Sequence, residues 1–90
     1  MFSKAPINFE RSSKEDIDKE ILRSAMIAEL DAINLYEEMA ALTDDEKLRK
    51  ILLEVANEEK IHVAMFETVL MEVDREYLRV MAKYALARNR

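Results

Sequence analysis

The chain has no glycine, no cysteine and no tryptophan, and its 90 residues include one proline, Pro6, and one histidine, His62. Tight turns and sheet corners usually need glycine or proline, so this composition favours an all-helical fold. The absence of cysteine excludes disulfides, thiolate metal sites and cysteine nucleophiles. The sequence has no long apolar run of the kind found in signal peptides and membrane spans, so we expect a cytoplasmic protein without membrane contact.

Half of the residues are apolar, 37% are charged and the net charge is -5. This balance fits a soluble, helix-rich domain rather than a disordered chain. Binding of nucleic acid without sequence preference needs a basic surface, so the negative charge argues against a nucleic-acid partner. A chain of this length buries only a small core by itself, and oligomerisation is a natural way to complete that core.

The pattern of polar and apolar residues predicts one small domain, made of an extended arm and three helices. The arm is expected over residues 1–11. The three helices are expected over about 13–42, about 44–72 and about 75–87. Only a few residues separate the first two helices, so these should fold back as an antiparallel hairpin. Two such hairpins paired around a two-fold axis give a four-helix bundle. The expected fold is therefore an all-α hairpin with a short third helix, dimerising into a bundle.

Capping residues are predicted at the start of each helix. Ser12 and Glu15 have the S-x-x-E spacing of a capping box, in which two side chains satisfy the first free N–H groups. Thr43 and Glu46 repeat this spacing as T-x-x-E, and Asp74 is the predicted cap of the third helix.

Each long helix carries an apolar stripe with alternating spacings of four and three, which is typical of core positions in a bundle. In the first helix the stripe consists of Leu22, Met26, Glu29, Ile33, Tyr36 and Ala40. In the second helix it consists of Leu48, Leu52, Val55, Glu59, His62, Phe66 and Val69. Ionisable residues interrupt both stripes near their centres.

Glu29, Glu59 and His62 are therefore candidate metal ligands. Buried carboxylates are costly and persist inside proteins when they are paired or bind a metal. Glu59 and His62 lie three positions apart, so they share one face of a helix. A bundle that binds two metals through carboxylates uses one Glu from each of two helices and a Glu-x-x-His from each of the other two. The hairpin has half of this set, so we expect a dimer to hold a dinuclear centre between its subunits.

The spacing leaves alternatives open. Glu58 is a rival ligand, because it lies four positions before His62 on a second apolar stripe: Ile51, Val55, Glu58, His62, Met65 and Val69. Tyr36 lies seven positions after Glu29 and is either a neighbour of the metal or an ordinary core aromatic. A purely structural helical dimer, in which Glu29, Glu59 and His62 form an internal hydrogen-bond network, is the alternative to a metal site.

Two carboxylates and one imidazole per metal suit iron or manganese, since structural zinc usually has more Cys or His ligands. Two adjacent ferrous ions can together pass electrons to oxygen, which is ferroxidase chemistry. A metal-binding module for storage or delivery, without turnover, would use the same ligands and is the second hypothesis.

The segments AELDAINLYEEMA and LLEVANEEKIHVAMFE resemble the encapsulated ferritins, which are ferritin-like proteins held inside encapsulin nanocompartments. The resemblance covers roughly residues 20–70 and rests on E-x6-Y followed by E-E-x-x-H. It implies that Glu29, Glu59 and His62 bind iron and that Tyr36 lies beside the di-iron centre. It also implies a ferritin-like bundle with a ferroxidase centre at the dimer interface and an annular homodecamer. Iron would be mineralised in a surrounding shell of encapsulin, the expected partner protein.

The sequence departs from this family in two places. Members often carry another acidic residue just before the ligand Glu, near a proposed access path for iron, and here that position is Ala28. Asp31 keeps one carboxylate nearby. Free-standing members end in a flexible tail with a short apolar docking peptide, whereas this sequence stops at KYALARNR. We therefore expect a truncated chain, a piece of a fusion with the shell protein, or a different route to the shell.

Overall fold

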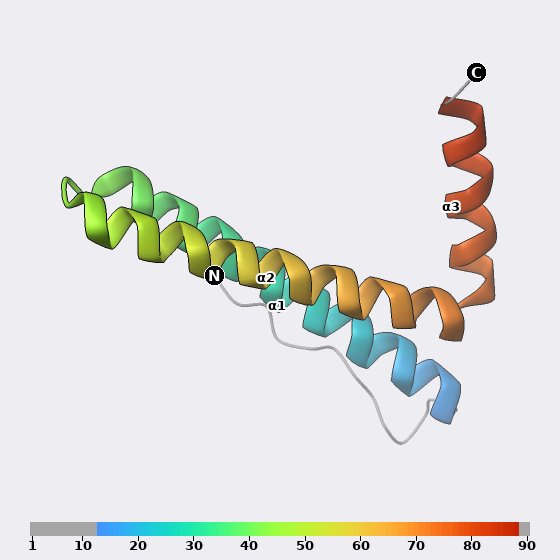
Figure 1. Cartoon of the computed structure of the whole chain (residues 1–90). Helices are drawn as coiled ribbons and strands as arrows, with labels where there is room; N and C mark the ends of the chain where they lie inside the picture. The colour runs from blue at the N-terminus through green and yellow to red at the C-terminus, as the bar shows by residue number, and fades with distance from the viewer. Residues whose placement is uncertain (1–12, 89–90) are drawn as a thin grey trace.

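The computed structural model describes residues 13–88, which form three α-helices (Figure 1). α1 spans Lys14–Leu42, α2 spans Glu46–Val73 and α3 spans Arg75–Arg88. α1 and α2 lie side by side and antiparallel, and α3 turns away from the hairpin at the end of α2 (Figure 1). This confirms the predicted all-α hairpin with a short third helix. The predicted arm over residues 1–11 lies outside the described residues.

The turn between α1 and α2 is closed by an arginine of α2 rather than by glycine. Arg49 Nε donates a hydrogen bond of 3.0 Å to the carbonyl oxygen of Ala40, near the end of α1. The same guanidinium also donates to the carbonyl oxygen of Thr43 and pairs with Glu46. One side chain therefore satisfies carbonyl groups that the end of α1 leaves without a helical partner.

The cap of α2 differs from the predicted capping box. Asp45 is the N-cap, and its Oδ1 accepts hydrogen bonds from the N–H groups of Lys47 and Leu48 at 2.9 and 3.2 Å. The Thr43 N–H, which a capping box would give to Glu46, instead donates to the carbonyl oxygen of Met39 as α1 ends. α2 therefore begins at Glu46, two residues after its predicted start.

The cap of α1 also lies one residue later than predicted. Ser13 Oγ accepts a hydrogen bond of 3.2 Å from the Asp16 N–H, and α1 begins at Lys14. Ser12, the predicted cap, lies outside the described residues. The side chains near the start of α1 thus use the same S-x-x-acid spacing, shifted by one position.

Asp74 joins all three helices. Its N–H donates to the carbonyl oxygen of Leu70 in α2, and its Oδ1 accepts from the Tyr77 N–H in α3, the capping bond that the sequence predicts. Its Oδ2 accepts a hydrogen bond of 2.8 Å from Arg23 in α1. The hydrogen bond from Tyr77 and the Arg23 guanidinium lower the pKa of the buried Asp74 carboxyl, although its desolvation acts in the opposite direction.

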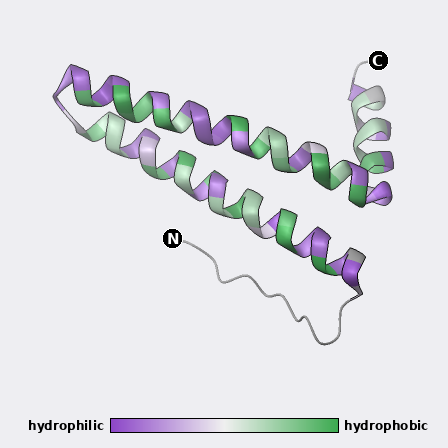
Figure 2. Cartoon of the chain, turned by 60° about the horizontal axis from the view of Figure 1, so that its bottom comes forward, coloured by the Kyte–Doolittle hydropathy of each residue, from purple (hydrophilic) through white to green (hydrophobic). Residues whose placement is uncertain are grey.

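The hairpin core is thin. Among the described residues, the buried apolar side chains are Ile33, Ala40, Ala56 and Leu70. No large side chain in this part of the chain is fully buried. Apolar residues recur on several sides of the helices, as Figure 2 shows by colour. Among residues 13–88, no helix is long and apolar enough to cross a membrane.

The hairpin by itself buries only part of the predicted core stripe of α2. Leu48 and Val69, placed in the core by the pattern, have exposed fractions of 45% and 44%, whereas Ala56 and Leu70 are buried instead. We call the side of α2 that packs on α1 its inner face: Leu52, Ala56, Glu59, Val63, Phe66 and Leu70. We call the adjacent exposed apolar residues its outer face: Leu48, Ile51, Met65 and Val69. With Val55, Glu58 and His62 between its members, the outer face lies on a row that alternates spacings of three and four like the inner face, and contact with α1 selects one of the two rows.

Candidate metal centre

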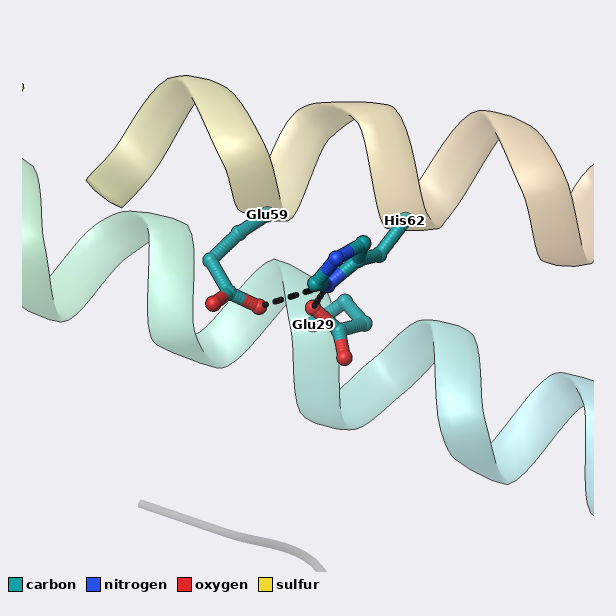
Figure 3. A group of neighbouring side chains, drawn as sticks. All are labelled: Glu29, Glu59 and His62. Atoms are coloured by element: carbon teal, nitrogen blue, oxygen red, sulfur yellow. Dashed lines mark hydrogen bonds and ion pairs between the residues drawn. The ribbon is translucent and has the colours of Figure 1, made fainter. Parts of the chain in front are cut away.

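Glu29 from α1 and Glu59 and His62 from α2 meet at the middle of the hairpin (Figure 3). His62 Nδ1 lies 3.2 Å from Glu29 Oε2 and 3.5 Å from Glu59 Oε2. One potential ligand atom from each residue lies within 4.8 Å of the other two. The i,i+3 spacing brings Glu59 and His62 to one side of α2, and the antiparallel packing of α1 adds Glu29.

The three side chains differ in exposure. Those of Glu29 and Glu59 are 21% and 20% exposed, whereas that of His62 is 45% exposed. The two carboxylates are therefore largely covered by the hairpin itself. His62 lies at the edge of the outer face, so the cluster opens toward the side of α2 that no other described element covers.

The donor set fits a divalent cation. Within the part of the chain that the structure describes, neither Glu29 nor Glu59 forms an ion pair with lysine or arginine, and His62 is their shared partner. Two half-buried carboxylates without a fixed positive partner repel each other and favour a bound cation. An ion with metal–ligand distances of about 2.1 Å spans donor atoms about 3 to 4.2 Å apart, which is close to the observed spacing. Oxygen donors with one imidazole suit iron or manganese.

Glu58 and Tyr36 are not part of the cluster. The Glu58 side chain is exposed on α2, and the group of close donor atoms includes Glu59 instead. Tyr36 is half-buried on α1, and among the described contacts it makes no hydrogen bond to Glu29, Glu59 or His62. The geometry therefore favours Glu59 over its rival, and the role of Tyr36 beside a metal stays a prediction.

Asp31, the remaining acidic residue near the proposed access path, lies on α1 outside the cluster. Its Oδ2 is buried and has no hydrogen-bond partner among the described residues. Ala28 occupies the position at which the family resemblance leads us to expect a second carboxylate, and it is half-buried.

One contact near the centre was not predicted. Lys60 Nζ of α2 lies 2.9 Å from Glu37 Oε2 of α1, and both side chains are about half exposed. These residues directly follow Glu59 and Tyr36 in the sequence. Because the two partners lie on different helices, no local spacing indicates their pairing. The ion pair links the two helices that provide the candidate ligands.

Comparison with known proteins identifies the relatives of this chain. The family model described as EncFtn-like matches residues 6–86. The chain belongs to the EncFtn-like family. The resemblance to the encapsulated ferritins is thereby confirmed, and it extends beyond the two segments on which it rests.

Two relatives and one structure support this assignment. The chain is 59% identical over 64 residues to the ferritin-like-encapsulin shell fusion protein of Pyrococcus furiosus, a match that covers 71% of this chain and 18% of the fusion protein. It is 42% identical over 62 residues to the encapsulin nanocompartment cargo protein EncC of Myxococcus xanthus, covering 66% of this chain and 48% of EncC. The chain thus spans less than half of either relative.

The crystal structure of the encapsulated ferritin domain from Pyrococcus furiosus has the same fold. Its TM-score with this EncFtn-like chain is 0.76 at 46% sequence identity. The match covers 92% of this chain and 85% of the crystallised chain, so it includes the hairpin and the third helix together.

Proposed function

We propose that this EncFtn-like chain is a ferroxidase that oxidises Fe(II) to Fe(III) at a di-iron centre shared between two subunits. The observation that carries this proposal is the cluster of Glu29, Glu59 and His62 at the open edge of an incomplete core. Membership of the family supports iron as the metal that these donors bind. Manganese and other divalent ions suit the same donors and compete with iron for them.

The cluster is too small to hold a closed dinuclear centre by itself. One copy provides two carboxylates and one imidazole, which would leave an ion that prefers about six ligands half-coordinated by water. A second copy related by a two-fold axis doubles the set to four carboxylates and two imidazoles. This is the full complement of a di-iron four-helix bundle.

The outer face provides the surface on which such a second copy would pack. Its four residues have exposed fractions between 44% and 60%, and they flank His62 on both sides along α2. Covering them would remove apolar area from water and exclude solvent from the open side of the cluster. We therefore propose a homodimer formed through the outer face, with the four-helix bundle as its architecture. An annular homodecamer of such dimers is the proposed larger assembly.

In this centre ferrous iron is the substrate, and the protein positions it. Glu29 and Glu59 provide negative charge that favours the more highly charged Fe(III) product, and His62 provides the nitrogen ligand of each ion. Two Fe(II) ions give up one electron each, and these two electrons with two protons reduce one O2 to hydrogen peroxide. Holding both ions at one site makes the two-electron step possible without free one-electron intermediates.

We further propose that the protein works for iron storage and detoxification inside an encapsulin nanocompartment. The relative from Pyrococcus furiosus is named as a fusion with an encapsulin shell, and EncC is named as an encapsulin cargo protein. Both names support encapsulin as the partner of this chain, with the oxidised iron deposited in the compartment.

The test is anaerobic loading of the purified protein with Fe(II), followed by admission of oxygen. Ferroxidase activity predicts oxygen consumption and formation of Fe(III) well above the rate without protein. Mössbauer spectra of the loaded protein should show two coupled ions for every two chains, and magnetically isolated iron would end the shared-centre proposal. Iron binding without oxygen consumption would identify a non-catalytic metal-binding module. Absence of bound metal on elemental analysis would identify a purely structural dimer.

A further inference from the structure

Met65 is the most exposed of the methionines whose side chains the structure describes. Its exposed fraction is 60%, against 39% for Met81. The other described methionines are half-buried: Met26, Met39 and Met71. Peroxide oxidises the thioether of methionine to a sulfoxide, and the chain has no cysteine that would compete for the oxidant. Met65 is therefore the most accessible oxidisable sulfur in the described part of the chain.

Met65 also lies one helical turn from the candidate metal centre. It follows His62 by three positions on α2, so the two side chains share one side of the helix. A methionine side chain on a helix leans toward the preceding turn, which for Met65 is the turn that contains His62. The side chain of His62 is 45% exposed, more than either candidate carboxylate, and Met65 belongs to the outer face beside it. Met65 is thus placed on the side toward which the cluster opens.

Met26 provides a comparison within the same hairpin. It also lies one turn from a candidate ligand, since it precedes Glu29 by three positions on α1. However, Met26 is half-buried and lines a groove at the junction of the three helices, together with Leu70 and Tyr77. Both methionines are therefore close to a ligand along their helices, and exposure on the open side of the cluster distinguishes Met65.

The proposed reaction supplies an oxidant at this position. Two Fe(II) ions held by Glu29, Glu59 and His62 of the two subunits would reduce one O2 to hydrogen peroxide. Peroxide that leaves the cluster by its open side passes Met65 before it reaches bulk solvent. A molecule made beside its reaction partner meets that partner at a high effective concentration, which favours reaction with Met65 over the more distant methionines.

We infer that Met65 is the oxidation site that captures hydrogen peroxide from iron oxidation, an inference that rests on the proposed ferroxidase function. The sulfur of Met65 gives two electrons to the peroxide, the O–O bond breaks, and one oxygen forms the S=O bond of methionine sulfoxide. The second oxygen leaves as water with both protons. Capture removes peroxide before it reacts with further Fe(II) to give Fe(III), hydroxide and hydroxyl radical. Methionine sulfoxide reductases reverse this oxidation, so the residue is reusable.

The test measures sulfoxide at each methionine after turnover of the purified full-length protein. Anaerobic protein is loaded with Fe(II), oxygen is admitted with and without catalase, and peptides are analysed by mass spectrometry. Catalase destroys peroxide in bulk solvent, so with catalase the sulfoxide at Met65 should be at least about fivefold above that at Met26 or Met81. A level at Met65 no higher than at Met81 would overturn the inference, and so would loss of the Met65 sulfoxide when catalase is present.

Added peroxide separates the position of Met65 from its exposure. Iron-free protein treated with hydrogen peroxide, without catalase, should show no preference for Met65 over Met81 above about threefold, because peroxide from bulk solvent reaches every exposed thioether. The same preference for Met65 in this experiment as during iron oxidation would show that exposure alone directs the oxidation. That result would overturn capture at the centre.

The release of peroxide tests capture from the other side. Met65→Leu removes the thioether and nearly conserves the side-chain volume. During the first additions of Fe(II), this variant should release at least about twofold more hydrogen peroxide per Fe(II) oxidised than wild type. Met81→Leu is the matched control and should release as much as wild type. Equal release from wild type and both variants would contradict capture by Met65.

Failure of this inference and failure of the proposed ferroxidase function are distinguishable. Oxygen consumption with an unmodified Met65 would refute the capture of peroxide alone, whereas absence of oxygen consumption would refute both. Glu59→Ala should lose oxygen consumption and the Met65 sulfoxide together. Glu58→Ala, which removes an exposed carboxylate from the same turn, should keep both.

Discussion

The inner and outer faces of α2 lie on rows of the same helical periodicity but have different surroundings. On the inner face, Ala56 and Leu70 are 1% and 3% exposed. On the outer face, Ile51 and Met65 are 56% and 60% exposed. Hydrophobic character alone therefore does not decide burial in this protein. The inner face is covered by α1, whereas no other element of the described residues covers the outer face, which is the surface of the proposed dimer.

The candidate metal centre lies on the boundary between these two faces. Glu59 belongs to the inner face and is 20% exposed, whereas His62 is 45% exposed at the edge of the outer face. In the proposed dimer, folding of the hairpin completes one half of the site and association completes the other half. Variants on the inner face should therefore impair the stability of the hairpin, whereas variants on the outer face should impair association.

The largest effect is expected from the three candidate ligands. Glu29→Ala, Glu59→Ala and His62→Ala should each reduce the rate of ferrous oxidation by more than about 100-fold, because in the proposed shared centre each removes a donor from both ions. Stopped-flow absorbance of Fe(III) formation measures the rate, and far-UV circular dichroism checks that the helices remain.

Glu58→Ala is the control for these variants, since it removes an exposed carboxylate from the same turn of α2. Its rate should stay within about threefold of wild type. Wild-type rates in all three ligand variants would refute the site. A larger loss in Glu58→Ala than in Glu59→Ala would move the ligand to Glu58.

The next largest effect is expected from a core substitution on the inner face. Leu70→Ala should lower the free energy of unfolding by about 2–4 kcal/mol, because it leaves a cavity between packed helices. Met65→Ala on the outer face should change the stability of the dilute single chain by less than about 1 kcal/mol. Urea unfolding at several protein concentrations separates the two effects. Equal losses of unfolding free energy for both variants in dilute protein would show that the two faces contribute equally to the stability of the single chain.

Metal should strengthen association through the outer face. In the proposed dimer, Glu29 and Glu59 of two copies bring together four carboxylates, whose repulsion opposes association. Bound Fe(II) offsets this charge, so the dissociation constant of that interface should fall by about tenfold or more. Light scattering with and without Fe(II) measures the shift. Identical mass distributions would mean that apolar packing alone sets the interface.

The smallest effect concerns the junction of α3. The folded protein lowers the pKa of Asp74 from its ordinary value of 3.8, so this carboxylate stabilises the fold fully above about pH 4. That contribution is lost as the pH falls through the lowered folded pKa. Asp74→Asn should therefore melt at a lower temperature than wild type at pH 7, and the difference should shrink below pH 4. Thermal unfolding from pH 7 to pH 2 tests this, and a constant difference would contradict it.

Much of the fold follows from the sequence alone. The lack of glycine and the single proline leave helices as the available elements, and the short polar segment around Thr43 turns the chain back on itself. Asp74 marks the start of the third helix because its carboxylate can satisfy a free N–H group. The i,i+3 spacing of Glu59 and His62 likewise fixes their common side of α2 before any tertiary contact forms.

Other features were decided by tertiary structure. The exchange of Thr43 for Asp45 as the cap of α2 is not one of them, because it rests on hydrogen bonds within four residues along the chain. The choice between the two apolar rows of α2, and the placement of Glu59 rather than Glu58 beside His62, depend on how α1 packs against α2. The direction of α3 depends on Arg23, which lies 51 positions before Asp74. Local spacing determines which residues share a helix face, but only contacts between distant segments determine which face is covered.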